Sequence, residues 1–270
     1  RDIFLHMLSK ADDPCGGGRN MSEHFSSLPL RVVSPTACTG TKFLQAVGMA
    51  KAIKKDGGDE VVYVSSGEGA TSEGEFFEAL NYAGREELPV LFVIQNNGYA
   101  ISVPQSAQTG SHIHTMAKGF RMKSLEVDGT RFTDMFTTLK PLVAQMRKGA
   151  GPLLVEAHVV RIDSHSSSDD QTKYRTEEEL EAIRQRDPIA YSASRMLTWE
   201  VIDEAAIRRM HSEVQAMVNA AADEADAAAF PAPESAALHI YSGRQPVEVD
   251  SEPRFAGTEL VTMVDAINHG

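Results

Sequence analysis

The sequence predicts an α/β fold with a doubly wound parallel sheet. Short aliphatic runs recur up to residue 160, and amphipathic helical patterns lie between them. Gly, Pro or charged residues bound each run. Aliphatic runs of this length are typical of strands that are buried on both faces. Strands that alternate with helices favour a parallel sheet, because each crossover helix returns the chain to the same end of the sheet.

The elements follow in a regular order along the first part of the chain. The expected strands are 60–65, 89–95, 123–127 and 152–160, and the third of them has the weakest pattern. The expected helices are 1–9, 41–55, 72–86 and 132–148. Ser72 and Glu75 have the spacing of a capping box, which predicts that the third helix starts just after Gly69.

The last third of the sequence changes to polar helical patterns. We expect helices over 176–186, 189–199 and 203–230, the last of which Pro231 ends. The predicted organisation is therefore a domain over 1–175, a helical extension of it over 176–240, a linker over 241–258 and the start of another region at 259–270. The chain starts without Met and stops within an apolar-periodic segment, so we expect it to be part of a longer polypeptide.

Composition excludes several classes of protein. The 270 residues include 26 Lys and Arg against 38 Asp and Glu, a net charge of −12, which is unlike a nucleic-acid-binding protein. No apolar run approaches the length of a membrane span, so we expect no membrane partner. The only cysteines, Cys15 and Cys38, are too few for a disulfide framework, and this favours a cytoplasmic protein.

Two short motifs follow neighbouring predicted strands. Gly67-Glu68-Gly69 comes after the first strand and Asn96-Asn97 after the second, with 26 residues between Gly69 and Asn96. Both turns should lie at the carboxyl edge of the sheet, where α/β proteins bind ligands. Glycines allow close approach to a phosphate, and carboxylate and amide oxygens suit Mg²⁺. A diphosphate with Mg²⁺ is the expected ligand.

This G-E-G and N-N pair resembles the thiamine-diphosphate motif. The surrounding residues resemble the alpha part of the decarboxylating component of 2-oxo acid dehydrogenase complexes, branched-chain type. The resemblance extends to about residue 241. The matching segments are 18–24, 45–48, 67–75, 96–102, 127–129, 165–170, 174–178 and 187–188.

The resemblance implies a thiamine-diphosphate-binding fold over 1–175 and a set of site residues. Glu68, Asn97 and the backbone oxygen of Tyr99 would hold Mg²⁺, and His165 would be the catalytic residue near the thiazolium. The implied cofactor-binding residues are Ser34, Gly67, Glu68, Gly69, Ala70, Gln95, Asn97, Tyr99, Ile101 and His165. Gln95 stands where the branched-chain type has Arg, which removes one positive diphosphate contact. A potassium site near Ser34, and a pocket or structural role for His24, are left open.

The implied reaction is oxidative decarboxylation of a 2-oxo acid, with a branched-chain acid favoured. The acyl group would pass to a lipoyl group of the partner acyltransferase. The implied assembly is a bacterial heterotetramer with a beta subunit, or a fused dimer with a beta half, since the segment after Gly257 resembles the start of that half. The general base belongs to the beta half, so we expect this chain alone to be inactive. A pyruvate or acetoin dehydrogenase-type component and a non-catalytic fragment are the alternatives.

Overall fold

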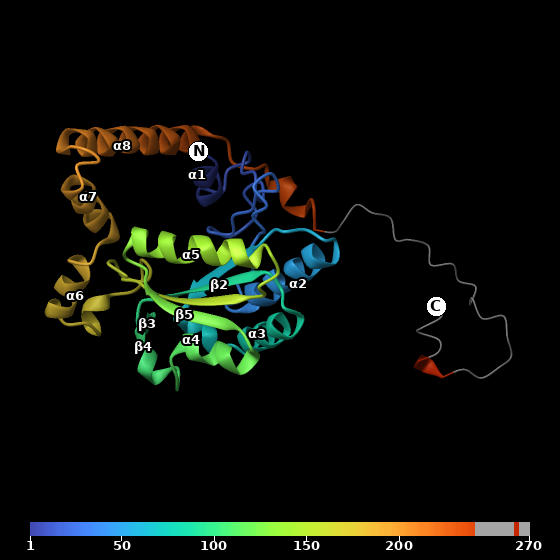
Figure 1. Cartoon of the computed structure of the whole chain (residues 1–270). Coiled ribbons are helices and arrows are strands. Elements are labelled where there is room, and N and C mark those ends of the chain that lie inside the picture. The colour runs from blue at the N-terminus through green and yellow to red at the C-terminus, as the bar shows by residue number, and fades with distance from the viewer. Residues whose placement is uncertain (241–261, 265–270) are drawn as a thin grey trace.

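The computed structural model describes residues 1–240 and 262–264, and its centre is a parallel sheet of β1 (Val62–Gly67), β2 (Val90–Asn96), β5 (Lys123–Asp128) and β6 (Leu153–His158) (Figure 1). The order across the sheet is β1-β2-β6-β5, and all three pairings are parallel. The four predicted strands are confirmed, including the weak one at 123–127. The strand that comes last in sequence, β6, occupies a central position.

Helices cover both faces of this sheet (Figure 1). α2 (Thr41–Lys55) and α3 (Gly74–Glu86) pack together on one face, where Phe43 lies 5.0 Å from Phe76 and 6.1 Å from Phe92 between ring centroids. α5 (Phe132–Met146) covers the other face with a second apolar cluster around β6. Two buried layers on opposite faces explain why the strands are almost uniformly apolar, and they confirm the doubly wound arrangement.

The predicted capping box at Ser72 is wrong. Residues Glu68–Ser72 form a 3₁₀ helix, in which the Thr71 hydroxyl donates to the Glu68 carbonyl at 2.7 Å. Because Ser72 is still helical, the extended residue that an N-cap requires is Glu73, with φ −74° and ψ 141°. α3 therefore begins at Gly74 without a side-chain cap.

Between β2 and β5 the chain forms short elements. β3 (Tyr99–Ala100) pairs with β4 (Val103–Pro104) in a small antiparallel ribbon directly after β2. α4 (Ile113–Met116) follows and contacts β5 and β6. This region lies close to the carboxyl end of the sheet.

Three further helices follow within residues 176–240, the segment predicted as a helical extension; the first two lie on the left of Figure 1 and the third runs along its top. They are α6 (Glu177–Arg184), α7 (Pro188–Thr198) and α8 (Glu204–Ala227). Side chains cap each one at its first turn: Thr176 with Glu179 in a capping box, then Asp187 and Asp203. Of the predicted linker at 241–258 and the region from 259, only residues 262–264 lie within the described part. None of the described helices is both long and apolar enough to cross a membrane.

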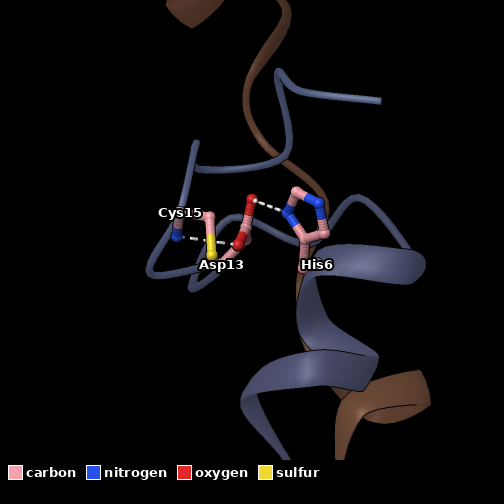
Figure 2. Close-up of side chains that lie close together, drawn as sticks. All are labelled: His6, Asp13 and Cys15. Atoms are coloured by element: carbon pink, nitrogen blue, oxygen red, sulfur yellow. Dashed lines mark hydrogen bonds and ion pairs between the residues drawn. The ribbon is translucent and has the colours of Figure 1, made fainter. Parts of the chain in front are cut away.

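The N-terminal helix α1 (Asp2–Met7) packs against α8, and a compact turn follows it (Figures 1 and 2). Asp13 is buried in this turn and accepts hydrogen bonds from the backbone N–H groups of Cys15, Gly16 and Gly18 at 2.9–3.2 Å. His6 Nδ1 lies 3.1 Å from Asp13 Oδ2. Burial alone would raise the pKa of Asp13, but the bonds from Cys15, His6 and Gly18 hold it below its ordinary value.

The side chains of His6, Asp13 and Cys15 are of the kinds that bind metal ions, and their ligand atoms lie within 4.8 Å of one another (Figure 2). The ligand atoms that face one another already have hydrogen-bond partners, however, since His6 Nδ1 and Asp13 Oδ2 bond to each other. Cys15 Sγ donates to the Ser26 carbonyl at 3.4 Å and accepts from the Ser26 N–H at 3.3 Å. The hydrogen bonds of these three residues therefore stabilise the N-terminal turn.

We predict that Asp13→Asn lowers the free energy of unfolding at pH 7 by about 1–3 kcal/mol, because an amide nitrogen would face backbone donors in a buried site. The lowered pKa gives a second signature. The stabilisation by Asp13 is complete above the unfolded pKa of about 4 and is lost as the pH falls through the folded pKa. Urea unfolding at a series of pH values should show the gap between wild type and variant closing in acid. Asp12→Asn, at an exposed neighbour, is the control and should change little; a gap that is constant with pH would contradict the assignment.

Candidate functional site

The carboxyl ends of the strands gather polar residues at one edge of the sheet. In the strand register Gly67 pairs with Gln95, and His158 pairs with both Asn96 and Asp128. The two motif turns therefore lie side by side, as the sequence predicts. This edge is the usual ligand-binding location in open parallel sheets.

Glu68 is the most unusual residue at this edge, because its carboxylate is almost fully buried, with 1% of the residue exposed. Its Oε2 accepts a hydrogen bond from the backbone N–H of Asn97 at 3.2 Å. Its Oε1 is buried without any hydrogen-bond partner among the described residues. An unsatisfied buried carboxylate oxygen is costly, and a cation beside it would remove that cost.

The turn after β2 is held by its own side chains. Asn96 Oδ1 accepts from the Gly98 N–H at 3.0 Å, and Asn97 Oδ1 accepts from the Tyr99 N–H at 3.3 Å. Gly98 has φ +84°, which a residue with a side chain adopts only with strain. Ile101 also has a positive φ, of 56°, and is half exposed. The turn is joined to Glu68 through the Asn97 N–H, and the short strand β3, which starts at Tyr99, contacts the 3₁₀ helix that starts at Glu68.

The two glycines of the first motif have different surroundings. A Cβ added at Gly69 would lie only 2.6 Å from the Cβ of Ala100. A Cβ added at Gly67 would meet no described atom within 4 Å, and the φ of Gly67, −73°, suits any residue. Packing thus explains Gly69, whereas open space lies in front of Gly67. Ala70, the next predicted residue, is buried against the core.

A buried polar network, which the sequence analysis missed, lies behind the second motif. Glu156, in the middle of β6, is 0% exposed. It accepts from Asn96 Nδ2 at 2.7 Å, from the His114 N–H at 2.9 Å and from His114 Nδ1 at 2.8 Å. Burial raises the pKa of Glu156, but the bonds from His114 and Asn96 outweigh that and keep the carboxylate charged. A lone Glu within an aliphatic strand was the available signal.

The loop that carries His165 is tied to the second motif by polar and aromatic contacts. Arg161 Nη2 donates to the Ile101 carbonyl at 2.8 Å and to the Tyr174 hydroxyl at 2.7 Å. Arg175 lies over the Tyr99 ring at 4.6 Å, and the rings of Tyr99 and Tyr174 are 5.6 Å apart. The base of the loop is therefore fixed against the turn that follows β2.

Within this loop, Asp169 accepts from the Tyr174 hydroxyl at 2.6 Å and from the His165 N–H at 2.8 Å. These two bonds hold the pKa of Asp169 below its ordinary value. The side chain of His165 is exposed. The Nε and Nη1 atoms of Arg161 are buried and have no partner among the described residues, so the loop base also keeps free donors.

The structure brings together some of the predicted site residues and not others. Contacts connect the segment from Gly67 to Ala70 with the one from Asn97 to Ile101. Gln95 is exposed at the end of β2, beside Gly67. Ser34 and His165 are exposed on separate segments, and no hydrogen bond in the described part links them to Glu68 or Asn97. His24, in the N-terminal region, has its Nδ1 near the carbonyls of Met21 and Ser22.

Chemically, the buried and unpartnered oxygen of Glu68 is suited to holding a small, hard cation. The other oxygens of these two turns that could contribute are the amide oxygen of Asn97 and the backbone carbonyl of Tyr99. Mg²⁺ is typically bound by one or two protein carboxylates or similar oxygens and completes its octahedron with phosphate and water. The open space at Gly67 leaves room for such a group.

Comparison with known proteins decides the family. Residues 1–234 match the family described as "Dehydrogenase E1 component". The chain belongs to the dehydrogenase E1 component family.

Family members of two substrate types are similar to this chain. The 2-oxoisovalerate dehydrogenase subunit alpha of Bacillus subtilis is 35% identical over 243 residues, which cover 90% of this chain and 74% of that protein. The pyruvate dehydrogenase E1 component subunit alpha of Staphylococcus aureus is 35% identical over 162 residues, 59% of this chain and 44% of that protein. A solved structure from Mycobacterium smegmatis, described as a thiamin diphosphate-dependent enzyme, has a TM-score of 0.40 and 24% identity, and covers 48% of this chain and 24% of its own.

We predict opposite effects for alanine at the two glycines of this E1 chain. Gly69→Ala should lower the free energy of unfolding by about 1–3 kcal/mol, because its Cβ collides with Ala100. Gly67→Ala should leave stability unchanged or slightly raised, since nothing crowds its Cβ. Thermal unfolding of both variants without added ligand measures the difference. Equal loss of stability in the two variants would show that Gly67 is packed as tightly as Gly69.

Proposed function

We propose that this chain is the alpha component of a thiamine-diphosphate-dependent 2-oxo acid dehydrogenase, in which residues 1–175 bind the diphosphate side of the cofactor through Mg²⁺. The reaction is oxidative decarboxylation of a 2-oxo acid, with transfer of the acyl group to a lipoyl group. The observation that carries the proposal is the buried, unpartnered oxygen of Glu68 beside Asn97, at the carboxyl edge of the sheet in a family member.

The residues of this chain have separable roles in that function. Thiamine diphosphate, when bound, supplies the nucleophile and electron sink that decarboxylation of a 2-oxo acid needs. Glu68, Asn97 and the Tyr99 carbonyl would hold Mg²⁺, and the open space at Gly67 would admit the diphosphate. Gln95, exposed at the same edge, is neutral, so the metal carries more of the diphosphate charge than it would beside an Arg. Gly69, Ala70 and Ile101 would line the proposed cofactor site.

His165 is the proposed catalytic residue. Its imidazole is exposed on a loop whose base is fixed to the Tyr99 turn, so it can reach the substrate side of the site while the loop tip adjusts. A ring nitrogen of His165 would hold or release a proton near the substrate or the lipoyl group. Ser34, exposed on a different segment, is the residue that we assign to the aminopyrimidine end of the cofactor.

A branched-chain 2-oxo acid is the favoured substrate, because the 2-oxoisovalerate relative aligns with 90% of this chain. Pyruvate is the second candidate, on the strength of the pyruvate dehydrogenase relative. Assay of the complete enzyme with an artificial electron acceptor and a panel of pyruvate, 2-oxoglutarate and branched-chain 2-oxo acids distinguishes them. Preference for pyruvate would replace the favoured substrate and leave the proposed cofactor site intact.

The proposed partners are a beta subunit or beta half, in a heterotetramer or fused dimer, and a lipoyl-bearing acyltransferase. The general base for the cofactor comes from the beta side. Apolar side chains on α7 and α8 line an open groove and include Ile189, Met210 and Val214, which are 69%, 52% and 52% exposed. Exposed apolar surface of this kind supports association with further subunits. The described chain alone is then expected to lack activity, and we place it in the cytoplasm.

Glu68→Gln in the complete enzyme tests the cofactor site. The amide keeps the shape of the side chain but cannot carry a negative charge. Loss of an outer-sphere partner typically lowers metal affinity by about 10–100-fold. Because Glu68 is a proposed direct ligand, affinity for thiamine diphosphate in the presence of Mg²⁺ should fall by more than that. Titration calorimetry with and without Mg²⁺ measures it. Glu78→Gln, an exposed carboxylate on α3, is the matched control. Unchanged affinity for the Glu68 variant would refute the metal site.

His165→Ala in the complete enzyme should lower kcat for lipoyl acylation by about 10²–10⁴-fold, the contribution of a positioned proton-transfer group. Cofactor affinity should change much less, because the Glu68 and Asn97 turns are untouched. Ser167→Ala, exposed in the same loop, is the control. Both variants must match wild type in melting temperature. Turnover within about threefold of wild type, which is only about 0.7 kcal/mol, would show that His165 is a surface residue.

A further inference from the structure

The side chain of Glu156 contacts Asn96, a residue of the second motif that is 60 residues away in sequence, and fixes the orientation of its side-chain amide. Its Oε1 accepts from Asn96 Nδ2 at 2.7 Å, while its Oε2 accepts from the backbone and ring nitrogens of His114. Glu156 is 0% and Asn96 5% exposed, so water does not compete for these bonds. A charged carboxylate only accepts hydrogen bonds, and it therefore admits only the NH₂ end of the Asn96 amide.

This choice of amide orientation determines the next turn. With Nδ2 directed at Glu156 and at Gln105 Oε1, which lies 2.9 Å away, the oxygen of the Asn96 amide faces the Gly98 N–H at 3.0 Å. That bond closes the turn at Gly98, where φ is +84°. Asn97 and Tyr99 lie on either side of Gly98, so their oxygens depend on the same closure.

We propose that Glu156 is a positioning residue: by fixing the orientation of the Asn96 amide, it sets the Asn97–Tyr99 turn in the geometry that binds the metal and cofactor. The identity of the ligand in this inference rests on the proposed function. The effect of Glu156 on the turn is independent of it, because the hydrogen bonds are present without any ligand. Outer-sphere partners of this kind typically change metal affinity by about 10–100-fold.

Glu156→Gln separates orientation from packing, because it keeps the volume of the side chain. If the new amide oxygen bonds to His114, its NH₂ faces Asn96, which must rotate and turn its own NH₂ toward the Gly98 N–H. If the new oxygen bonds to Asn96, two donors meet at His114. The single variant therefore cannot satisfy both His114 and Asn96, and we expect the Gly98 turn to loosen.

The reciprocal exchange Asn96→Asp with Glu156→Gln should restore the turn. In that double variant the new amide at position 156 accepts from the His114 N–H through its oxygen, and its NH₂ donates to one oxygen of the new carboxylate at position 96. The other oxygen of that carboxylate then accepts from the Gly98 N–H, as the original amide does, and the Gln105 amide turns over so that its NH₂ group, rather than its oxygen, faces the carboxylate. Asn96→Asp alone places two carboxylates together and should be the worst of the three.

Two measurements on the full-length protein with its partner subunit test this. In the absence of ligand, exchange of the Gly98 amide should be about 5- to 10-fold faster in E156Q than in wild type, as for loss of one hydrogen bond. Calorimetric affinity for thiamine diphosphate with Mg²⁺ should fall about 10–100-fold. Both should recover in the double variant. Glu126→Gln is the control, since Glu126 touches His158 and the same His114 but has no bond to Asn96.

The outcomes separate this inference from the proposed function. Wild-type affinity and Gly98 exchange in E156Q would overturn the positioning role, and so would a folded double variant that fails to recover either property. If E156Q alone does not fold, N96D is compared with the double variant: recovery of cofactor affinity and of slow Gly98 exchange in the double variant supports the positioning role, and no recovery overturns it. If wild type binds no thiamine diphosphate, the proposed function fails, while the Gly98 exchange still reports on the turn.

Discussion

A carboxylate inside a protein needs partners to replace the water it has lost, and at Glu68 the fold supplies only half of them. One oxygen is bonded to the backbone of Asn97 and the other is buried and free of any described partner. The contact between Glu68 and Asn97 arises because β1 and β2 are adjacent and parallel, so the turn that follows β1 lies against the turn that follows β2. The close approach of Gly69 to Ala100 fixes the two turns at that separation. Apart from Ser34, the other candidate site residues lie on these two turns or on segments that contact them.

Three segments that are held by different kinds of contact make up the candidate site. The strand ends are held by the apolar layers on both faces of the sheet and by the buried carboxylate of Glu156. The turn after β2 depends on amide side chains that bond to their own backbone. The loop from Arg161 to Tyr174 depends mainly on polar contacts, several of them exposed. Polar, solvent-accessible contacts open at lower free energy than packed strands, so adjustment of the site is concentrated in the loop.

Hydrophobic pattern was enough to predict the strands and the doubly wound sheet, because both depend on local burial periodicity. The G-E-G and N-N spacing was enough to place Glu68 and Asn97 at one edge, since adjacent parallel strands end together. The start of α3 was predicted wrongly, because a 3₁₀ turn precedes it and occupies the Ser72 position. The role of Glu156 was missed for a different reason: its partners Asn96 and His114 are 60 and 42 residues away in sequence. Pairings of that range depend on the position of β6 between β2 and β5, which the pattern does not specify.

The contact of α1 and the turn after it with the C-terminal end of α8 has a consequence for the order of folding. The Lys10 ammonium donates to the Asp226 carbonyl, and the Ala11 N–H donates to the Ala229 carbonyl, so this contact closes a loop of more than 200 residues. The strands β1 and β2, by comparison, pair residues that are 28 positions apart. Loop-closure entropy favours the short-range pairing early and the long-range contact late. The N-terminal helix is thus expected to pack against α8 only after the sheet has formed, and to separate from α8 early when the protein unfolds.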